Sequence, residues 1–365
     1  MPTGNSATMR GRATSSIASW LATGTIPASP RRISPRSAAS RPPSDPLRTL
    51  STRSPAPGGD PPGALPSSSA MKAGKASRTA EVVAAIRAAH RSYEKPVLFD
   101  DPFAIEMTSP PWRLACRSRF LYWLLAERCF GDLKGVRAHI LARSRFAEER
   151  LFEAVSRGVR QYVVLAAGFD TFLLRRPAAW SELAIFEVDH PATQRVKIAR
   201  LERLGTLPPV TFVPIDFERQ TLGEALAQPP FSSELPTFCS WLGAIPYLSR
   251  EAVFETFSGI AAVCAPGSEI VFDYGVSPER LDPALQRRAQ RLLRFTARRG
   301  EPLRTFFDPE ELMERLDAIG FSMIENLSPE VIDRRYFTGR ADGLRPSPGG
   351  WIAHCRLREA MHPAH

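Results

Sequence analysis

Residues 161–171 read QYVVLAAGFDT, a short apolar run that ends at Gly168 and is followed by the acid Asp170. An apolar run of this length, bounded by turn residues, is typical of a strand buried on both faces of a parallel sheet. Because glycine has no Cβ, Gly168 lets the backbone approach a ligand closely. We therefore take this run as the first strand of the fold, and the loop after it as a candidate binding segment.

Similar strand-like runs follow along the chain, separated by helical segments. The runs are AIFEVD (184–189), VTFVPID (210–216), PTFCSWLGAI (236–245), SEIVFDYG (268–275), FSMIENL (321–327) and WIAHCRL (351–357). Short apolar strands that alternate with helices of 10–15 residues indicate βαβ units and a parallel sheet. The sequence therefore predicts a Rossmann-like α/β core over residues 159–365.

Helical patterns dominate the segment before the first strand. Its candidates are EVVAAIRAAHRSY (81–93), WRLACRSRFLYWLLAERCF (112–130) and VRAHILARSRFAEERLFEAV (136–155), the last two interpreted as long amphipathic helices. Since these helices precede the first strand, we expect residues 71–158 to form an N-terminal helical cap over one end of the sheet.

The N-terminal 70 residues carry much of the net charge of +10, with eight Arg, no Lys and only Asp45 and Asp60 as acids. The rest of this segment is mainly Ser, Pro, Ala and Gly, a composition typical of disorder. It is interpreted as a transit peptide, as a tail that touches anions nonspecifically, or as an upstream extension of the reading frame. We favour the extension, with Met71 as the start, because the first folded pattern begins just after it.

Composition excludes several classes of protein. No run reaches the 18–20 apolar residues or so of a membrane-spanning helix, so we expect a soluble protein without a membrane partner. No recognised nucleic-acid module is present, so no specific nucleic-acid partner is expected. The five cysteines are widely spaced and lack a C-x-x-C pair, which argues against a zinc site and for a reducing, cytoplasmic compartment.

Candidate ligand-binding residues follow the first three strands, where open parallel sheets bind ligands. Asp189 ends the second strand about 20 residues after Gly168, where a carboxylate accepts both ribose hydroxyls of an adenosine. Asp216 follows the third strand and is suited to accept the adenine amino group, while Phe217 covers the ring. Structural alternatives are a helix N-cap for Asp189 and a solvated loop acid for Asp216.

The ligand indicated by these residues is S-adenosylmethionine (SAM). The G-x-G-x-x-G pattern of dinucleotide-binding proteins is absent. Asp170 would also repel a pyrophosphate at the N-terminus of the following helix. SAM has no phosphate and carries a sulfonium and an ammonium, so a loop with an acid suits it better. An NAD-dependent oxidoreductase of the same topology remains the alternative.

Several motifs together resemble the leucine carboxyl methyltransferase family, in its bacterial branch of SAM-dependent O-methyltransferases. They are RSRFAEERLFEAVSRGVRQYVVLAAGFDT, IFEVDHP, VPIDFE, PTFCSWLGAIPYLS and EIVFDY, and the resemblance runs from about Ser77 to the C-terminus. It implies a class I SAM-dependent methyltransferase fold over the domain 71–365. It also implies that Arg143 pairs with the methionyl carboxylate, with Arg145 as the alternative, and that Gly168, Asp189 and Asp216 contact the methionine part, ribose and adenine.

Two positions depart from the family pattern. Leu242 stands where members related to the eukaryotic enzyme carry a glutamate, which puts a protein carboxylate as substrate in doubt and keeps a catalytically silent SAM-binding protein as an alternative. The family's G-A-G loop becomes Ala166-Ala167-Gly168 here, which we interpret as a minor change.

The implied reaction is methyl transfer to an oxygen, of a carboxylate or a hydroxyl, on a small-molecule or peptide substrate. A carboxylate acceptor needs no base, because positioning supplies most of the rate, whereas a hydroxyl needs one. Candidate bases, each more commonly structural than catalytic, are His90, Tyr93, His139, His190 and Tyr247, of which Tyr247 is also a weak candidate for lining the pocket. Candidates to line the acceptor pocket from the cap are Trp112, Tyr122 and Trp123.

Overall fold

A computed structural model describes residues 77–124, 134–205, 207–227, 230–298 and 302–359 of the chain. The predicted disorder of residues 1–70 and the start at Met71 lie outside the described residues. Of the five cysteines, the four within the described residues are buried free thiols. No helix in the described part of the chain combines the length and the apolar character needed to cross a bilayer.

A seven-stranded sheet forms the centre of the fold, with the strand order β3-β2-β1-β4-β5-β7-β6. Strands β1 to β5 run parallel, and β7 pairs antiparallel with both β5 and β6. Their bounds are β1 Gln161–Leu165, β2 Ala184–Asp189, β3 Thr211–Pro214, β4 Thr237–Trp241, β5 Glu269–Gly275, β6 Phe321–Leu327 and β7 Gly350–Leu357. This is the Rossmann-like class I methyltransferase fold that the sequence predicts.

The strand register brings the candidate segments to one edge of the sheet. Leu165, at the end of β1, lies opposite Val188 of β2 on one side and Trp241 of β4 on the other. Strand order reverses between β1 and β4, and in open α/β sheets ligands bind at such a switch point, beyond the carboxyl ends of the strands. The loops after β1, β2 and β4 therefore share one possible binding edge.

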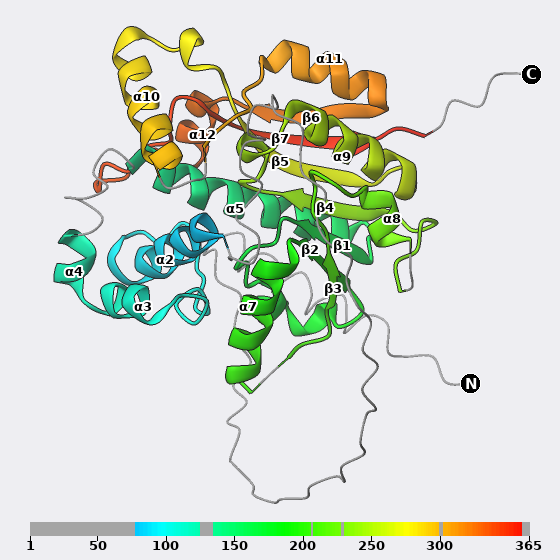
Figure 1. Ribbon diagram of the computed structural model, residues 1–365, viewed down its shortest axis with the longest axis horizontal. Coiled ribbons are helices and arrows are strands. Elements are labelled where there is room, and N and C mark those ends of the chain that lie inside the picture. Colours follow the sequence, from blue (N-terminus) through cyan, green and yellow to red (C-terminus); the bar gives the residue numbers. More distant parts are fainter. Residues whose placement is uncertain (1–76, 125–133, 206, 228–229, 299–301, 360–365) are drawn as a thin grey trace, which may run out of the picture.

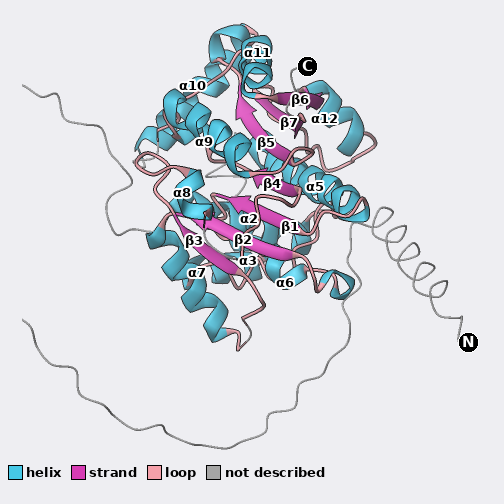
Figure 2. Ribbon diagram, turned by 90° about the vertical axis from the view of Figure 1, so that its right-hand side faces the viewer, coloured by secondary structure: helices cyan, strands magenta, loops and turns pink. Residues whose placement is uncertain are grey.

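Helices cover both faces of the sheet, with α8 and α9 on one face and α5 and α12 on the other (Figure 2). The α-helical bounds are α2 Arg78–Tyr93, α3 Pro110–Arg117, α4 Arg119–Trp123, α5 Lys134–Ser156, α6 Phe172–Arg175, α7 Pro191–Arg203, α8 Leu222–Leu226, α9 Arg250–Val263, α10 Pro283–Arg298, α11 Pro309–Ile319 and α12 Pro329–Tyr336. Single 3-10 turns, η3 to η5, cover Ala178–Trp180, Ile245–Tyr247 and Pro278–Arg280. Helices α2, α3 and α4 lie together beyond the sheet (Figure 1).

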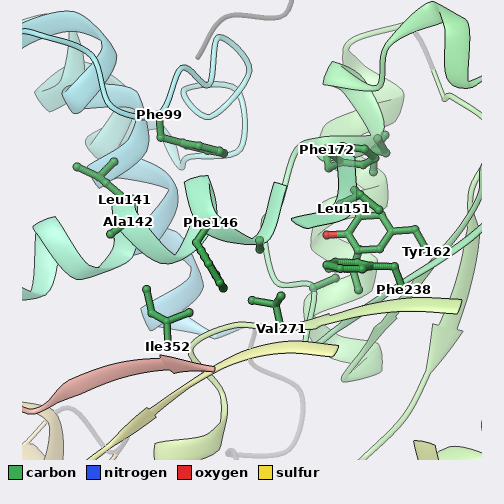
Figure 3. Close-up of a cluster of buried hydrophobic side chains, with 14 of the residues drawn as sticks. Phe99, Leu141, Ala142, Phe146, Leu151, Tyr162, Phe172, Phe238, Val271 and Ile352 are labelled. Atoms are coloured by element: carbon green, nitrogen blue, oxygen red, sulfur yellow. The ribbon is translucent and has the colours of Figure 1, made fainter. Parts of the chain in front are cut away.

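Helix α5 joins the predicted cap to the core. It packs against β4, β5 and β7, and its Phe146 points toward Val271 and Ile352 of the sheet (Figure 3). Residues 71–158 thus include one helix that covers a sheet face as well as the helices beyond it. The division of the chain into a cap and a core stays a prediction.

The structure differs from the sequence predictions at two places: one predicted helix is broken, and one helix was not predicted. The expected continuous helix from residue 112 is wrong, because α3 ends at Arg117 and α4 begins at Arg119. Ser118 between them has an extended backbone, and its hydroxyl accepts the N–H of Leu121 as an N-cap. Serine side chains compete for backbone N–H groups in this way and so favour helix ends. Helix α12 was not predicted, although Ser328 and a proline at its first position are N-terminal signals.

Buried charged groups hold the loop after β1 against two helices. From α2, Arg87 donates to the carbonyl of Phe169 at 2.6 Å and pairs with Asp101 at 2.9 Å. The Asp101 carboxylate also accepts the hydroxyl of Thr171 at 2.7 Å. From α6, Arg175 donates to the same Thr171 hydroxyl and, through both terminal nitrogens, to Glu148 of α5. We call Arg87, Asp101, Thr171, Arg175 and Glu148 the loop network.

Replacing Glu148 by Gln should lower the free energy of unfolding by about 3 kcal/mol, since it removes the closest counter-ion of the buried Arg175 guanidinium, at 2.6 Å, and leaves the longer contact with Asp101, at 3.6 Å. Glu311→Gln is the matched control, because it removes a carboxylate from the exposed Arg250 and should cost only about 0–1 kcal/mol. Denaturant unfolding of both variants measures the difference. Equal losses would show that the loop network does not carry this stability.

Candidate functional site

The structure brings together Gly168 and Asp189, two of the predicted cofactor contacts, at the ends of β1 and β2. The Asp189 carboxylate accepts the N–H of Gly168 at 2.6 Å and the N–H of His190 at 2.6 Å. An ionised carboxylate has about four acceptor positions, so about two remain for a ligand. The side chain that caps helix α7 is His190, through its Nδ1, and Asp189 is therefore not the N-cap.

Burial raises the pKa of Asp189, while the two backbone N–H groups and Lys197 act in the opposite direction. The neighbouring Glu187 pairs with Lys197 of α7 at 2.5 Å, and both side chains are fully buried. Burial raises the pKa of Glu187 to about 7, against the effect of Lys197. The end of β2 therefore has two carboxylates. Glu187 is paired with a lysine, and Asp189 is bound by backbone N–H groups.

The loop after β1 has an unusual backbone at Ala166. Its φ is +51°, the only positive φ of a non-glycine residue among the described residues, and Gly168 has a φ of +50°. A Cβ at Gly168 would lie 3.2 Å from the Cβ of Ala80 in α2, so the start of α2 lies against this loop. An L-residue in this region of φ carries a conformational cost that glycine avoids. The interpretation of Ala166 as a minor change stays a prediction.

The segment after β3 lies beside Asp189 through its backbone. The N–H of Ile215 donates to the carbonyl of Asp189 at 3.0 Å. The Asp216 carboxylate is about one-third exposed and accepts the N–H of Glu218 at 3.1 Å. The Phe217 ring lies 6.1 Å from that of Trp241, at the end of β4. Asp216 thus shapes its own turn, and the Phe217 ring packs toward Trp241 at the end of β4.

Of the two candidate arginines on α5, Arg143 is bound to an acid near the strand ends. Its Nη1 donates to Asp273 of β5 at 2.7 Å, and its guanidinium lies against Gly243. Arg145 instead donates to Glu149 on its own helix, 2.6 Å away. These contacts therefore favour Arg143 over Arg145 as the arginine near the candidate binding edge.

Most candidate bases have structural partners. Burial lowers the pKa of His90 to about 3, and its ring bonds to Glu94 and to the N–H of Leu98. The Tyr93 hydroxyl donates to the carbonyl of Cys116. Tyr247 is half-buried in η4, after β4, and its role stays a prediction.

The three aromatic residues predicted to line an acceptor pocket differ in their surroundings. The ring of Tyr122 stacks on Tyr93 with centroids 5.2 Å apart, and Trp112 packs against the alanine cluster of α2. Trp123 is half exposed. These contacts support the packing of the cap, and a role in binding an acceptor stays a prediction.

Asp273 is the residue that the sequence reasoning missed. Its carboxylate accepts Arg143, His139 and the N–H of Gly243. The available signal was an acid near the carboxyl end of an otherwise apolar strand, SEIVFDYG. Leu242, at the position of the family glutamate, is partly buried and packs against the core cluster that α5 covers.

Comparison with known proteins identifies relatives of this chain. The family model described as leucine carboxyl methyltransferase matches residues 80–261. A Bacillus subtilis (strain 168) protein named "Putative S-adenosyl-L-methionine-dependent methyltransferase YktD" is 31% identical over 291 residues, which cover 75% of this chain and 95% of that protein. A Mycolicibacterium smegmatis protein described in the same terms is 32% identical, over 63% of this chain and 71% of its own.

Solved structures show the same fold at low identity. A DUF574 family protein from Streptomyces avermitilis matches with a TM-score of 0.53 and 14% identity, over 77% of this chain and 98% of its own. A protein from Thermobifida fusca described as a putative methyltransferase matches with a TM-score of 0.51 and 18% identity, over 79% and 97%. At these identities the likeness concerns the fold alone.

Replacing Ala166 by Gly should raise the free energy of unfolding by up to about 1 kcal/mol, because it removes the cost of a positive φ at an L-residue. Ala167→Gly is the control. Since Ala167 has no positive φ, this replacement should lower the free energy of unfolding by about 0.5–1 kcal/mol. Urea unfolding measures both variants. A lower free energy of unfolding in both variants would contradict a conformational cost at Ala166.

Proposed function

We propose that this chain, which belongs to the leucine carboxyl methyltransferase family and is a SAM-dependent methyltransferase, transfers the methyl group to an oxygen atom of its acceptor. The observation that supports the cofactor site is the buried Asp189 carboxylate, which accepts the N–H of Gly168 beside the switch point of the sheet. The oxygen acceptor is argued from the contacts of the candidate bases below. When bound, SAM supplies a methyl group on a positively charged sulfur. The residues described below bind and orient it.

The residues present fit this cofactor. Asp189 keeps acceptor positions for the two ribose hydroxyls, and Gly168 adopts the positive φ of the turn that directs its N–H to Asp189. We assign Asp216 and Phe217 to the adenine, because both follow β3, next to the end of β2. Arg143, at the ends of β4 and β5, is assigned to the methionyl carboxylate.

Charge in the loop after β1 supports SAM over a dinucleotide. Burial alone would raise the pKa of Asp170, but the guanidinium groups of Arg87 and Arg175 hold the pKa below its ordinary value. The loop therefore keeps a fixed negative charge at the start of α6. Such a charge repels a pyrophosphate and attracts a cationic ligand.

The state of the candidate bases supports an acceptor that is already ionised. Of the five candidates, His90, Tyr93 and His190 are bound in structural roles, and His139 donates to Asp273. Tyr247 remains a candidate base. A carboxylate needs no proton removed before it attacks the methyl group, so positioning supplies the catalysis. We therefore favour a carboxylate on a small molecule or peptide over a hydroxyl.

Asp189→Asn should weaken SAM binding at least tenfold, about 1.4 kcal/mol, because the neutral amide replaces one ribose acceptor with a donor. Calorimetric titration of the full chain with SAM, S-adenosylhomocysteine and NAD measures this. Asp317→Asn, at an exposed helix position, is the control and should leave the affinity unchanged. A preference of the unaltered protein for NAD would reject the proposed cofactor site.

The same titrations should depend on pH. Protonation of Asp189 removes acceptor positions, so SAM affinity falls as the pH falls through the pKa of that group. Since burial raises this pKa above its ordinary value of 3.8, the loss begins at a higher pH than for an exposed aspartate. Asp189→Asn should lack this decline.

With carboxylic acids as acceptors, the product should be a methyl ester, which mild base hydrolyses to methanol. Transfer from labelled SAM to a panel of carboxylic acids, phenols and amines, followed by base treatment and mass spectrometry, checks this. An ionised acceptor predicts a rate that changes little between about pH 6 and 8, because carboxylates are already deprotonated there. Label that resists base would point instead to an ether or an N-methyl product.

A further inference from the structure

The carboxyl end of β5 carries a second charged cluster, to which the proposed function assigns only Arg143. Asp273, almost fully buried, accepts the Nη1 of Arg143 at 2.7 Å, the Nε2 of His139 at 3.1 Å and the N–H of Gly243 at 2.6 Å. Burial alone would raise the pKa of Asp273, but Arg143 and His139 hold the pKa below its usual range. The carboxylate is therefore ionised and bound by three donors.

Two glycines make room for the partners of Asp273. Gly243 has a φ of +75°, and a Cβ there would lie 2.9 Å from the Cζ of Arg143 and nearer still to both terminal nitrogens. A Cβ at Gly350 would lie 2.8 Å from the Nδ1 of His139. Both side chains of α5 therefore pack directly on backbone, one turn apart, and Asp273 holds them there.

We propose that Asp273 is a positioning residue for the cofactor: it holds the guanidinium of Arg143 at the ends of β4 and β5, so that its remaining N–H groups face the methionyl carboxylate. The proposal rests on the proposed function. An arginine has five N–H donors, and the bond to Asp273 uses one at Nη1. A side chain already held in place loses less rotamer freedom when the ligand binds.

Asp273 also places an acid next to Leu242, the position of the family glutamate. The family glutamate would place a carboxylate at position 242, where this chain has an apolar side chain. The carboxylate of Asp273 reaches the next residue, Gly243, from the neighbouring strand. An acid is therefore still present at the end of β4, and it acts through Arg143.

Two ligands distinguish the positioning role of Asp273 from a general effect on protein stability. S-adenosylhomocysteine carries the methionyl-type carboxylate, whereas 5′-methylthioadenosine has the same adenosine and sulfur without the amino-acid part. Asp273→Asn in the full chain should weaken the binding of S-adenosylhomocysteine about tenfold and change the affinity for 5′-methylthioadenosine less than about twofold. Calorimetry measures both affinities. Asp189→Asn should weaken both ligands, since both contain the ribose.

Glu269→Gln is the matched control for Asp273→Asn. Glu269 lies at the opposite end of the same strand and is also a buried acid bound by a histidine and arginines, His354, Arg356 and Arg157. Its replacement should lower thermal stability without changing either affinity. If Asp273→Asn does not fold, Gly243→Ala displaces the guanidinium with Asp273 intact and should give the same ligand pattern.

A double-mutant cycle tests whether Asp273 acts through Arg143. In an Arg143→Ala background, Asp273→Asn should cause no further loss of S-adenosylhomocysteine affinity. Additive losses, equal losses for the two ligands, or tighter S-adenosylhomocysteine binding by Asp273→Asn would each overturn the positioning role. Failure of the unaltered protein to bind either nucleoside would instead reject the proposed function on which it rests.

Discussion

Hydrogen bonds among buried charges hold the loop after β1, and the candidate site depends on them. Arg87 of α2 binds the carbonyl of Phe169, and Arg175 binds both Thr171 and Glu148 of α5. Removing guanidinium and carboxylate groups from water is costly unless each is paired and hydrogen-bonded. Because every charged member of the loop network has an oppositely charged partner, the loop and the helices α2, α5 and α6 adopt their positions together.

The binding edge contains two similar arrangements, one on each side of the strand-order switch. In the first, Asp189 at the end of β2 accepts the N–H of Gly168, which follows the neighbouring strand β1. In the second, Asp273 near the end of β5 accepts the N–H of Gly243, which follows the neighbouring strand β4. Both glycines have positive φ. Each aspartate therefore fixes a left-handed turn of the adjacent strand, and the two turns border the same edge.

Much of the fold could be predicted because its signals are local. The apolar runs predicted the strands, and the acid at the end of the second strand, Asp189, was identified as a candidate cofactor contact, because ligands bind beyond the carboxyl ends of parallel strands. The break at Ser118 was missed because a serine in a helical pattern is tolerated or caps a helix depending on its surroundings. The packing of α5 on a sheet face was not predicted, since an amphipathic pattern does not say what covers it.

The sequence by itself determined the order of the strands along the chain, the class of fold and the acids at the strand ends, because periodicity and strand ends are properties of neighbouring residues. Only the tertiary structure decided that Arg143 bonds to Asp273 near the end of β5 whereas Arg145 bonds to Glu149, because the direction in which α5 packs separates residues on the same helix. It also decided the partners of Asp273, which lie about 30 and 130 residues away along the chain. Contacts between such distant residues depend on how the strands are ordered in space, which no local pattern records.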